Sequence, residues 1–196
     1  MKRLLERLLN LTEDDIFKPY SFEELIQQKL KDCTLNSDGT YSSEGDVNLS
    51  DLGLTELPVK FKEVKGHFSC NDNNLTSLEG CPKEVGDGFW CGYNKLRSLK
   101  GAPEKVGGIF SCGNNKLRSL EGAPEYVGTD FDCRYNQLIS LKGAPEKVGG
   151  EFDCQYNKLT FLKGAPEHAG RIFWCDDNSV SVRELRKTIK RDYLII

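Results

Sequence analysis

Apolar and polar positions alternate over short stretches of this chain, and the stretches return at a fixed interval. Five consecutive segments of equal length start at Phe68, and each opens with Phe, one variable residue and Cys. The interval is 21 residues without slippage, and a weaker copy precedes the series from Val47. Apolar residues at every second position predict a short strand with one buried side. Phe and Cys are therefore expected to point into a core.

The rest of each repeat predicts a turn, a second buried stretch and a return leg. An Asn stands three residues after each Cys, where its amide can satisfy backbone groups of adjacent coils. Two Leu follow at fixed spacing, and then G-A-P-E-x-V-G, in which Gly and Pro exclude a long helix. The return leg is therefore expected to be extended or a brief turn.

A coil of this length cannot bury its apolar side alone. Successive coils are expected to stack and to form a parallel sheet with strands about 4.8 Å apart. The ends predict helices, because Ser21 with Glu24 and Ser181 with Glu184 have the spacing of capping boxes. The expected fold class is an α/β solenoid. It has a helical segment and linker (1–46), a repeat array (47–180) and a C-terminal capping helix (181–196).

The N-terminal segment of this plan has three parts. The amphipathic run KRLLERLLNL comes first, the capping-box helix SFEELIQQKLKD follows, and the polar stretch NSDGTYSSEGD leads into the array as a linker or loop. We expect the two apolar helix faces either to cap the first coil or to contact a partner.

The repeat pattern P-x-x-V-x-x-x-F-x-C-x-x-N-x-L-x-x-L resembles the leucine-rich repeat. It is most similar to the short bacterial type of secreted effectors, and closest to 21-residue GAPxxVGG arrays of bacteriophage-encoded proteins. It departs from the effector type by one extra residue between Pro and Asn, and by Phe and Cys in place of the usual Leu and Val. The resemblance implies a protein-binding strand face and a phage-encoded factor that binds or inhibits a host bacterial protein. Since no appended catalytic domain is found, the enzymatic roles of effectors do not transfer.

The variable positions on and after the strands supply the candidate partner-binding residues. Half of them are Tyr or Trp, the residue types that dominate binding hot spots, and most of the others are acidic. The ten candidates are Trp90, Tyr93, Asp130, Asp132, Arg134, Tyr135, Glu151, Asp153, Tyr156 and Trp174. An alternative interpretation is that the rings only cover neighbouring strands along the ladder.

The acidic members of this set fall side by side on adjacent strands, which costs stability. Water screens most of the cost, because two unit charges 4 Å apart repel by only about 1 kcal/mol in bulk solvent. Arg134 is placed to relieve the repulsion. A cation site is the alternative, but the sequence lacks the ligand loop of calcium motifs, and we expect no metal.

Charge bears on the class of partner. The net charge of -3 argues against bulk attraction to nucleic acid. A basic edge nevertheless recurs just beyond the strands: Lys95, Arg97, Lys116, Arg118 and Lys158. It predicts either an anionic partner such as nucleic acid or a solvated rim. We expect another protein as the partner, with nucleic-acid binding or mimicry as the alternative.

The sequence offers no catalytic grouping. Six of the eight cysteines recur every 21 residues, which is typical of a structural position and not of a disulfide pairing code or a CxxC metal site. The two histidines occupy different repeat positions, and no phosphate-binding loop is present. We therefore expect no enzyme and no cofactor. Reduced thiols and the lack of a signal-like or membrane-length apolar run predict a cytoplasmic protein without membrane contact, in the host bacterial cytoplasm if phage-encoded.

Overall fold

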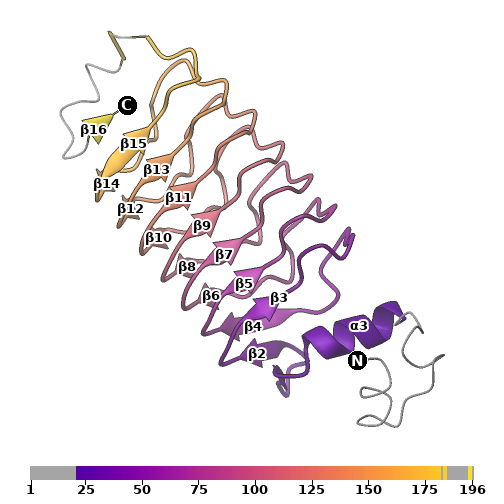
Figure 1. Cartoon of the computed structure of the whole chain (residues 1–196). Helices are drawn as coiled ribbons and strands as arrows, with labels where there is room; N and C mark the ends of the chain where they lie inside the picture. The colour runs from indigo at the N-terminus through magenta and orange to yellow at the C-terminus, as the bar shows by residue number, and fades with distance from the viewer. Residues whose placement is uncertain (1–20, 182, 185–193, 196) are drawn as a thin grey trace, which may run out of the picture. The chain divides into compact units, whose positions relative to one another are not determined.

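Each repeat forms one coil that contributes a strand to each of two sheets, as the computed structural model shows (Figure 1). The structure describes residues 21–181, 183–184 and 194–195. The chain divides into two compact units, Met1–Lys31 and Asp32–Ile196, and the second holds all the coils. This second unit is a parallel β-solenoid.

The predicted Phe-x-Cys strands build sheet B. Its order is β16-β15-β13-β11-β9-β7-β5-β3, and every pairing is parallel. Its members are β3 (Val47–Asn48), β5 (Phe68–Ser69), β7 (Phe89–Trp90), β9 (Phe110–Ser111), β11 (Phe131–Asp132), β13 (Phe152–Asp153), β15 (Ile172–Trp174) and β16 (Leu194–Ile195). Phe131 pairs with Phe110 and Phe152, so the register equals the sequence period and the predicted parallel sheet is confirmed.

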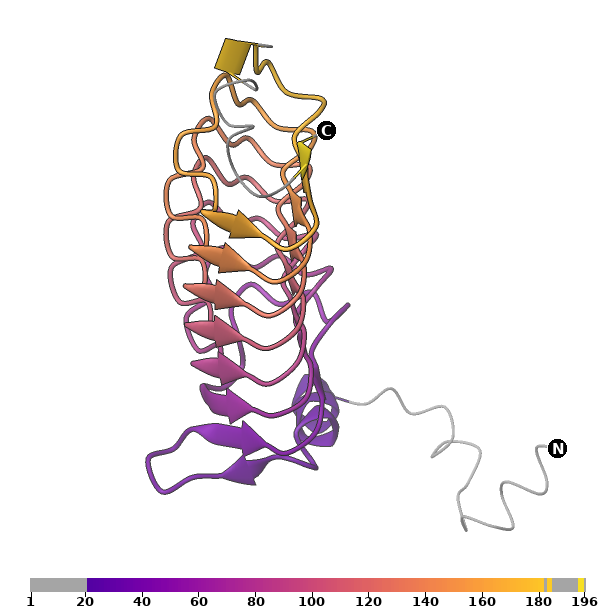
Figure 2. The ribbon, with the colours of Figure 1, turned by 90° about the vertical axis from the view of Figure 1, so that its left-hand side faces the viewer.

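The return legs form a second sheet, sheet A, which the sequence did not predict (Figure 2). Its strands, in sheet order, are β1 (Thr34–Leu35), β2 (Tyr41–Ser43), β4 (Phe61–Val64), β6 (Glu84–Val85), β8 (Lys105–Val106), β10 (Tyr126–Val127), β12 (Lys147–Val148) and β14 (His168–Ala169). Only β1 and β2 pair antiparallel. The stretch 36–46, expected to be a linker or loop, contains the strand β2, which pairs with β4 and belongs to the sheet.

The core lies between the two sheets and is built from repeated columns of side chains. Phe and Cys of sheet B, the two Leu and the Val of sheet A are buried in coil after coil, and the inward direction of Phe and Cys is confirmed. The six Phe rings from Phe68 to Phe173 stack, with centroids between 5.6 and 4.9 Å apart. Dispersion between these rings adds to the burial of their apolar area.

The coils contain no helix, so the α/β part of the expected fold class is not what the solenoid shows. In the first unit, α3 (Phe22–Lys29) starts at the predicted capping box: Glu24 N donates to Ser21 Oγ and Ser21 N donates to Glu24 Oε2. The predicted amphipathic run at residues 2–11 lies outside the described residues.

The C-terminal segment differs from its prediction at the last described strand. Glu184 N donates to Ser181 Oγ at 3.2 Å, which fits the expected helix start, but residues 182 and 185–193 lie outside the described part. The expected helix does not continue to the end. Leu194–Ile195 forms β16 and pairs in parallel with β15, because the edge of sheet B offers unpaired backbone groups to a following strand.

Candidate binding face of sheet B

One column of side chains runs along the outer side of sheet B. Strand register aligns its members in this order: Ser69, Trp90, Ser111, Asp132, Asp153 and Trp174. Two tryptophans thus stand at either end of three smaller residues. The predicted placement of two acids on adjacent strands is confirmed, since Asp132 pairs with Asp153.

Arg134 bridges these two acids. Its Nε and Nη2 donate to the carboxylate oxygens of Asp132 at 3.1 Å each, and its Nε lies 3.3 Å from Asp153 Oδ2. The hydrogen bond to Asp132 raises the pKa of Arg134, so the guanidinium stays charged. The predicted relief of the acidic repulsion by Arg134 is confirmed.

Both acids also close the turn that follows their own strand. Asp132 Oδ1 accepts from the backbone N of Arg134 at 3.0 Å, and Asp153 Oδ1 accepts from the backbone N of Gln155 at 3.1 Å. Asn48 makes the same bond to Ser50 N at 2.9 Å. An Asn therefore serves this turn as well as an Asp does, and the turn does not explain the negative charge.

Asp153 carries that charge at a cost. Burial is the main reason that the pKa of its carboxyl rises from 3.8 to about 6. The charges of Asp132 and Asp176 also raise this pKa, while the Gln155 N–H and Arg134 lower it. Since Arg134 is shared between two carboxylates, it compensates Asp153 only in part. The site holds an ionised carboxylate at neutral pH that the fold alone does not favour.

The other two acids of the predicted cluster lie in the neighbouring column. Asp130 Oδ1 accepts from the backbone N of Glu151 at 2.8 Å, as Asp46 Oδ1 does from His67 N. Glu151 Oε2 accepts from Trp174 Nε1 at 3.0 Å. Asp130 therefore has a structural role, and Glu151 fixes the orientation of the half-buried Trp174 ring.

Trp90 is half-buried at the other end of the column. Its ring lies 4.9 Å from the His67 ring, centroid to centroid, and covers Gly88. A Cβ on Gly88 would come within 2.4 Å of Trp90 Cη2, so only glycine permits this ring position. Sequence reasoning missed the His67 contact, and its one available signal was a small residue, Gly88, close to a large one, Trp90.

The three predicted tyrosines do not project from the strands but lie in the turn that follows each Cys. Tyr93, Tyr135 and Tyr156 have φ of 51°, 53° and 53°, in the left-handed region. Their side chains are 60%, 48% and 43% exposed. The rings of Tyr135 and Tyr156 stack with centroids 4.3 Å apart and planes 4° from parallel. We call these three residues the tyrosine row.

Two hollows lie along the column, and both are lined by Ser111, Asp132 and Arg134. One, of about 260 Å³, lies over Gly92 and Gly113 and reaches Tyr93 and Tyr135. The other, of about 360 Å³, reaches Trp90, Ile109, Asp130, Glu151 and Asp153. We call them together the trough. Ser111 and the two glycines were not among the predicted site residues, yet they make the depression because their side chains are small.

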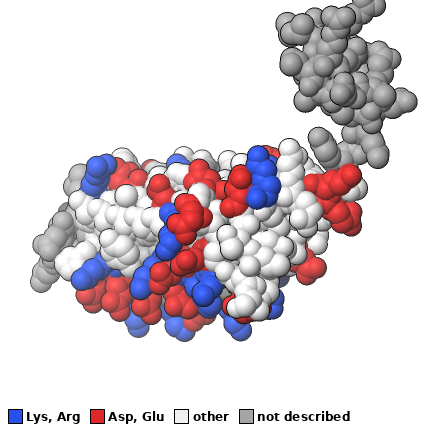
Figure 3. All heavy atoms as spheres, turned by 90° about the horizontal axis from the view of Figure 1, so that it is seen from below, with Lys and Arg blue, Asp and Glu red and all other residues white. Residues whose placement is uncertain are grey.

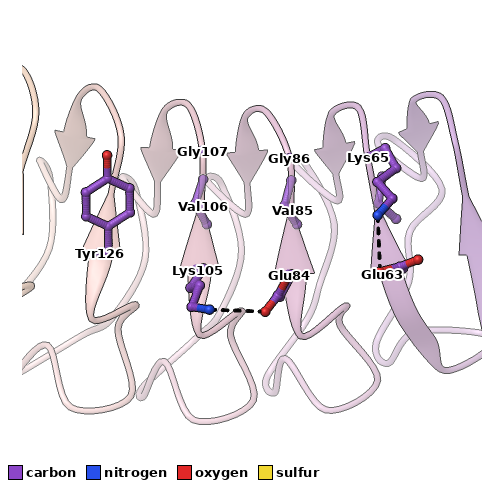
Figure 4. Close-up of a pocket in the computed structure, with 10 residues that line it drawn as sticks. Glu63, Lys65, Glu84, Val85, Gly86, Lys105, Val106, Gly107 and Tyr126 are labelled. Carbon is purple, nitrogen blue, oxygen red and sulfur yellow. Dashed lines mark hydrogen bonds and ion pairs between the residues drawn. The ribbon is translucent and has the colours of Figure 1, made fainter.

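A further hollow lies on sheet A over Val85 and Val106 (Figure 4). The charged side chains around it are paired: Lys105 with Glu84 at 3.4 Å and Lys65 with Glu63 at 3.5 Å. Gly86 and Gly107 shape this hollow, because a Cβ on either would come within 2.1 Å of a carbonyl oxygen in the preceding coil. Stacking of the coils explains the hollow without a ligand.

The ladder cysteines and the two histidines lie at separate places in the described coils. The ladder cysteines, Cys70 to Cys175, are buried and unpaired, and burial raises the pKa of thiols such as Cys112 and Cys133. His67 Nδ1 accepts from Gly88 N, whereas His168 lies on sheet A. Within the described ranges, no three His, Cys, Asp or Glu side chains come together as a metal site.

The five residues of the predicted basic edge are exposed beyond the tyrosine row. None of them forms an ion pair with a residue that the structure describes. On the face seen in Figure 3, acidic and basic side chains form a band between two uncharged areas, and no area of a single sign dominates. Charges of both signs are therefore mixed on this face.

No protein-family model matches this chain, and no curated protein matches it. Among the described residues, no helix has the length and apolar character needed to cross a bilayer.

Proposed function

We propose that this chain is a non-catalytic binding module of the leucine-rich-repeat type that holds another protein on the trough and the tyrosine row. The observation that carries the proposal is the backbone conformation of Tyr93, Tyr135 and Tyr156. A left-handed φ costs a bulky side chain roughly 1 to 2 kcal/mol, whereas Asn, Asp and Gly tolerate it better. The same turn position in other coils holds Asp51, Asp72, Asn114 and Asp177.

Stability alone therefore favours Asn or Asp at this position. Tyrosines that are about half exposed gain little from burial in the free protein. Contact with a partner would account for tyrosine at this position, because Tyr supplies a large, rigid contact area at low cost in side-chain entropy. The stack of Tyr135 on Tyr156 explains part of that pair, but not Tyr93, which has no ring partner among the described residues.

The test is capture of a partner from bacterial lysate with full-length protein as bait, followed by affinity measurement on the purified partner. The variant is the triple Tyr93→Asn, Tyr135→Asn, Tyr156→Asn, which we expect to be at least as stable as the wild type. Its affinity for the partner should fall by about 2 kcal/mol or more if the row contains a hot spot.

The matched control is Tyr126→Lys, since Tyr126 is an exposed tyrosine on sheet A whose column neighbours are Lys105 and Lys147. Capture should survive this change. Undiminished affinity of the folded triple variant would contradict the proposal.

A second candidate is single-stranded nucleic acid along the tyrosine row and the basic edge. The Lys and Arg side chains of the basic edge beside exposed rings favour it, because such proteins combine cations with stacking platforms. Binding of a labelled oligonucleotide would then weaken steeply with salt and with the paired change Lys116→Glu and Arg118→Glu. The carboxylates of the trough beside the row favour a protein partner instead.

Inhibition of a host protein by a phage-encoded factor, and a cytoplasmic location, are parts of the same proposal. They are supported by the repeat resemblance and by buried free thiols, which suit a reducing compartment.

A further inference from the structure

The size of the sheet B face limits what can occupy it. The column from Trp90 to Trp174 crosses four coil steps, about 19 Å at about 4.8 Å per strand. With about 15 Å along the strands, the face offers about 300 Å², well under the roughly 800 Å² per partner of a standard interface. An extended chain advances about 3.3 Å per residue, so about six residues span the column.

The charge of the face selects the occupant's chemistry. Four carboxylates, of Asp130, Asp132, Glu151 and Asp153, surround the trough, and Arg134 is the one guanidinium among its lining residues. Arg134 is committed to Asp132 through two hydrogen bonds of 3.1 Å. Among the residues that the structure describes, Asp153 has a single cationic partner atom, Arg134 Nε at 3.3 Å, and its side chain is only 17% exposed. A second cation beside Asp153 would complete its compensation.

The aromatic side chains around the trough fit the same occupant. Trp90 and Tyr93 line its two hollows near one end, and Trp174 stands next to Asp153 in the column. Faces of Trp and Tyr attract Arg and Lys side chains by cation–π interaction and cover their apolar stems. The aromatic rings and the carboxylates are separate observations, and both favour an Arg or Lys side chain in the trough.

We propose that the trough holds a single extended segment of the partner protein, about six residues long, that places an arginine or lysine beside Asp153 between the two tryptophans. The inference rests on the proposed function and names the chemistry of its partner. Asp132, Asp153 and Glu151 select the charge, and the floor of Ser111, Gly92 and Gly113 lets the segment approach the sheet.

The experiment is a selection of peptides of about twelve random residues, displayed on particles, against the folded full-length chain. The test variant is the double change Asp132→Asn and Asp153→Asn, which keeps the Oδ1 acceptors that close both turns. The matched control is Glu125→Gln and Glu146→Gln, which removes the same charge from the same two coils on the exposed flank of sheet A. Circular dichroism and thermal melting check that all three proteins are folded.

We expect wild type and control to enrich Arg- or Lys-containing peptides, and the Asp→Asn variant not to. A selected peptide should lose about tenfold or more in affinity when its arginine is replaced by citrulline, which keeps the shape and removes the charge. Enrichment without basic residues, equal enrichment on the Asp→Asn variant, or no enrichment would overturn the inference. So would a single-stranded RNA oligonucleotide that displaces the peptides from the wild type.

The captured lysate partner separates this inference from the function on which it rests. If the tyrosine-row variant loses the partner while the Asp→Asn variant keeps it, the binding module stands and the basic segment is wrong. If both variants keep the partner with wild-type affinity, the proposed function itself fails.

Discussion

At the scale of single residues, one asparagine per coil joins the backbone of adjacent coils, and four of these asparagines are buried: Asn73, Asn94, Asn115 and Asn136. Asn115 Nδ2 donates to the carbonyls of Cys91, Cys112 and Gly113 at 3.0, 3.1 and 3.3 Å, and its Oδ1 accepts from Leu96 N at 2.9 Å. Two of these four groups belong to the preceding coil. The predicted role of this Asn in satisfying backbone groups of adjacent coils is confirmed. Without the amide, Leu96 N–H would lose its acceptor, while the three carbonyls would each keep one donor: Asn94 Nδ2, Asn136 Nδ2 and Tyr93 N.

We predict that Asn115→Leu destabilises the protein by about 1 to 3 kcal/mol, because the buried Leu96 N–H loses its acceptor and three carbonyls each lose one of two donors. Urea unfolding followed by circular dichroism measures the change. Gln137→Leu, at an exposed position, is the control and should change stability by less than about 0.5 kcal/mol. Equal effects of the two variants would show that the amide network contributes little.

Asp153 gives a pH-dependent prediction. Its pKa of about 6 in the folded protein lies above the ordinary 3.8, so the folded state binds this proton more tightly than the unfolded state. The ionised carboxylate therefore reduces stability above about pH 6, and the loss disappears as pH falls toward 4. Asp153→Asn should be more stable than wild type by about 1 to 3 kcal/mol near pH 7.5.

The gain should shrink toward zero near pH 4, and urea titrations at both pH values measure it. Glu146→Gln is an exposed acid-to-amide control and should show no such trend. A gain independent of pH, or a loss at neutral pH, would mean that the ion pair with Arg134 outweighs the burial of Asp153. Stabilisation joined to loss of partner binding is the behaviour of a residue kept for function.

At the scale of elements, the strands of sheet A are separated from those of sheet B by glycines that the stacking requires. A Cβ on Gly128 would lie 1.9 Å from the carbonyl oxygen of Gly107 in the preceding coil, and the matching glycines of other coils, Gly86, Gly107, Gly149 and Gly170, are similarly close. The demand is one of space, because their φ values are not in the left-handed region. The coil spacing of sheet A therefore depends on this glycine column.

Gly128→Ala should lower stability by about 2 kcal/mol or more. The new Cβ would clash with a backbone carbonyl, which cannot move aside as a flexible side chain can. Gly45→Ala is the matched control, because a Cβ on Gly45 would meet no atom within 4 Å and the φ of this residue is not positive. The melting temperatures of the two variants give the comparison. A Gly128→Ala protein as stable as Gly45→Ala would show that the coils can separate without cost.

At the scale of the whole solenoid unit, repetition places one thiol per coil in a continuous buried row. The sheets end in β1 and β14 and in β16 and β3, each two residues long. Such short edge strands limit pairing with other chains. All thiols of this row are buried. Cys33 lies outside the row and is half-buried.

Thiol labelling reports on this arrangement. In the native protein without reductant, iodoacetamide should modify Cys33 first and leave the six ladder cysteines unmodified, because burial keeps them out of reach. Burial also raises the pKa of the five ladder thiols from Cys91 to Cys175. In urea all eight cysteines should react. Intact-mass analysis counts the labels, and rapid native labelling of the ladder, or disulfides within it, would contradict the buried row.

The sequence by itself determined the features that follow from its period. Because residues 21 apart become neighbours, the inward Phe and Cys columns, the Asn network, the parallel register of sheet B and the pairing of Asp132 with Asp153 were all predictable. The α3 start was predictable as well, since a capping box is a local interaction of Ser21 with Glu24.

The tertiary structure decided what depends on contacts outside that period. The return legs became sheet A because backbone pairing between stacked coils is available to any extended segment, even strands of two residues without alternation. The same rule made β2 and β16 strands where a linker and a helix were expected. The contact of Trp90 with His67 and the trough arise from side chains of several coils meeting, and no local pattern encodes such a meeting.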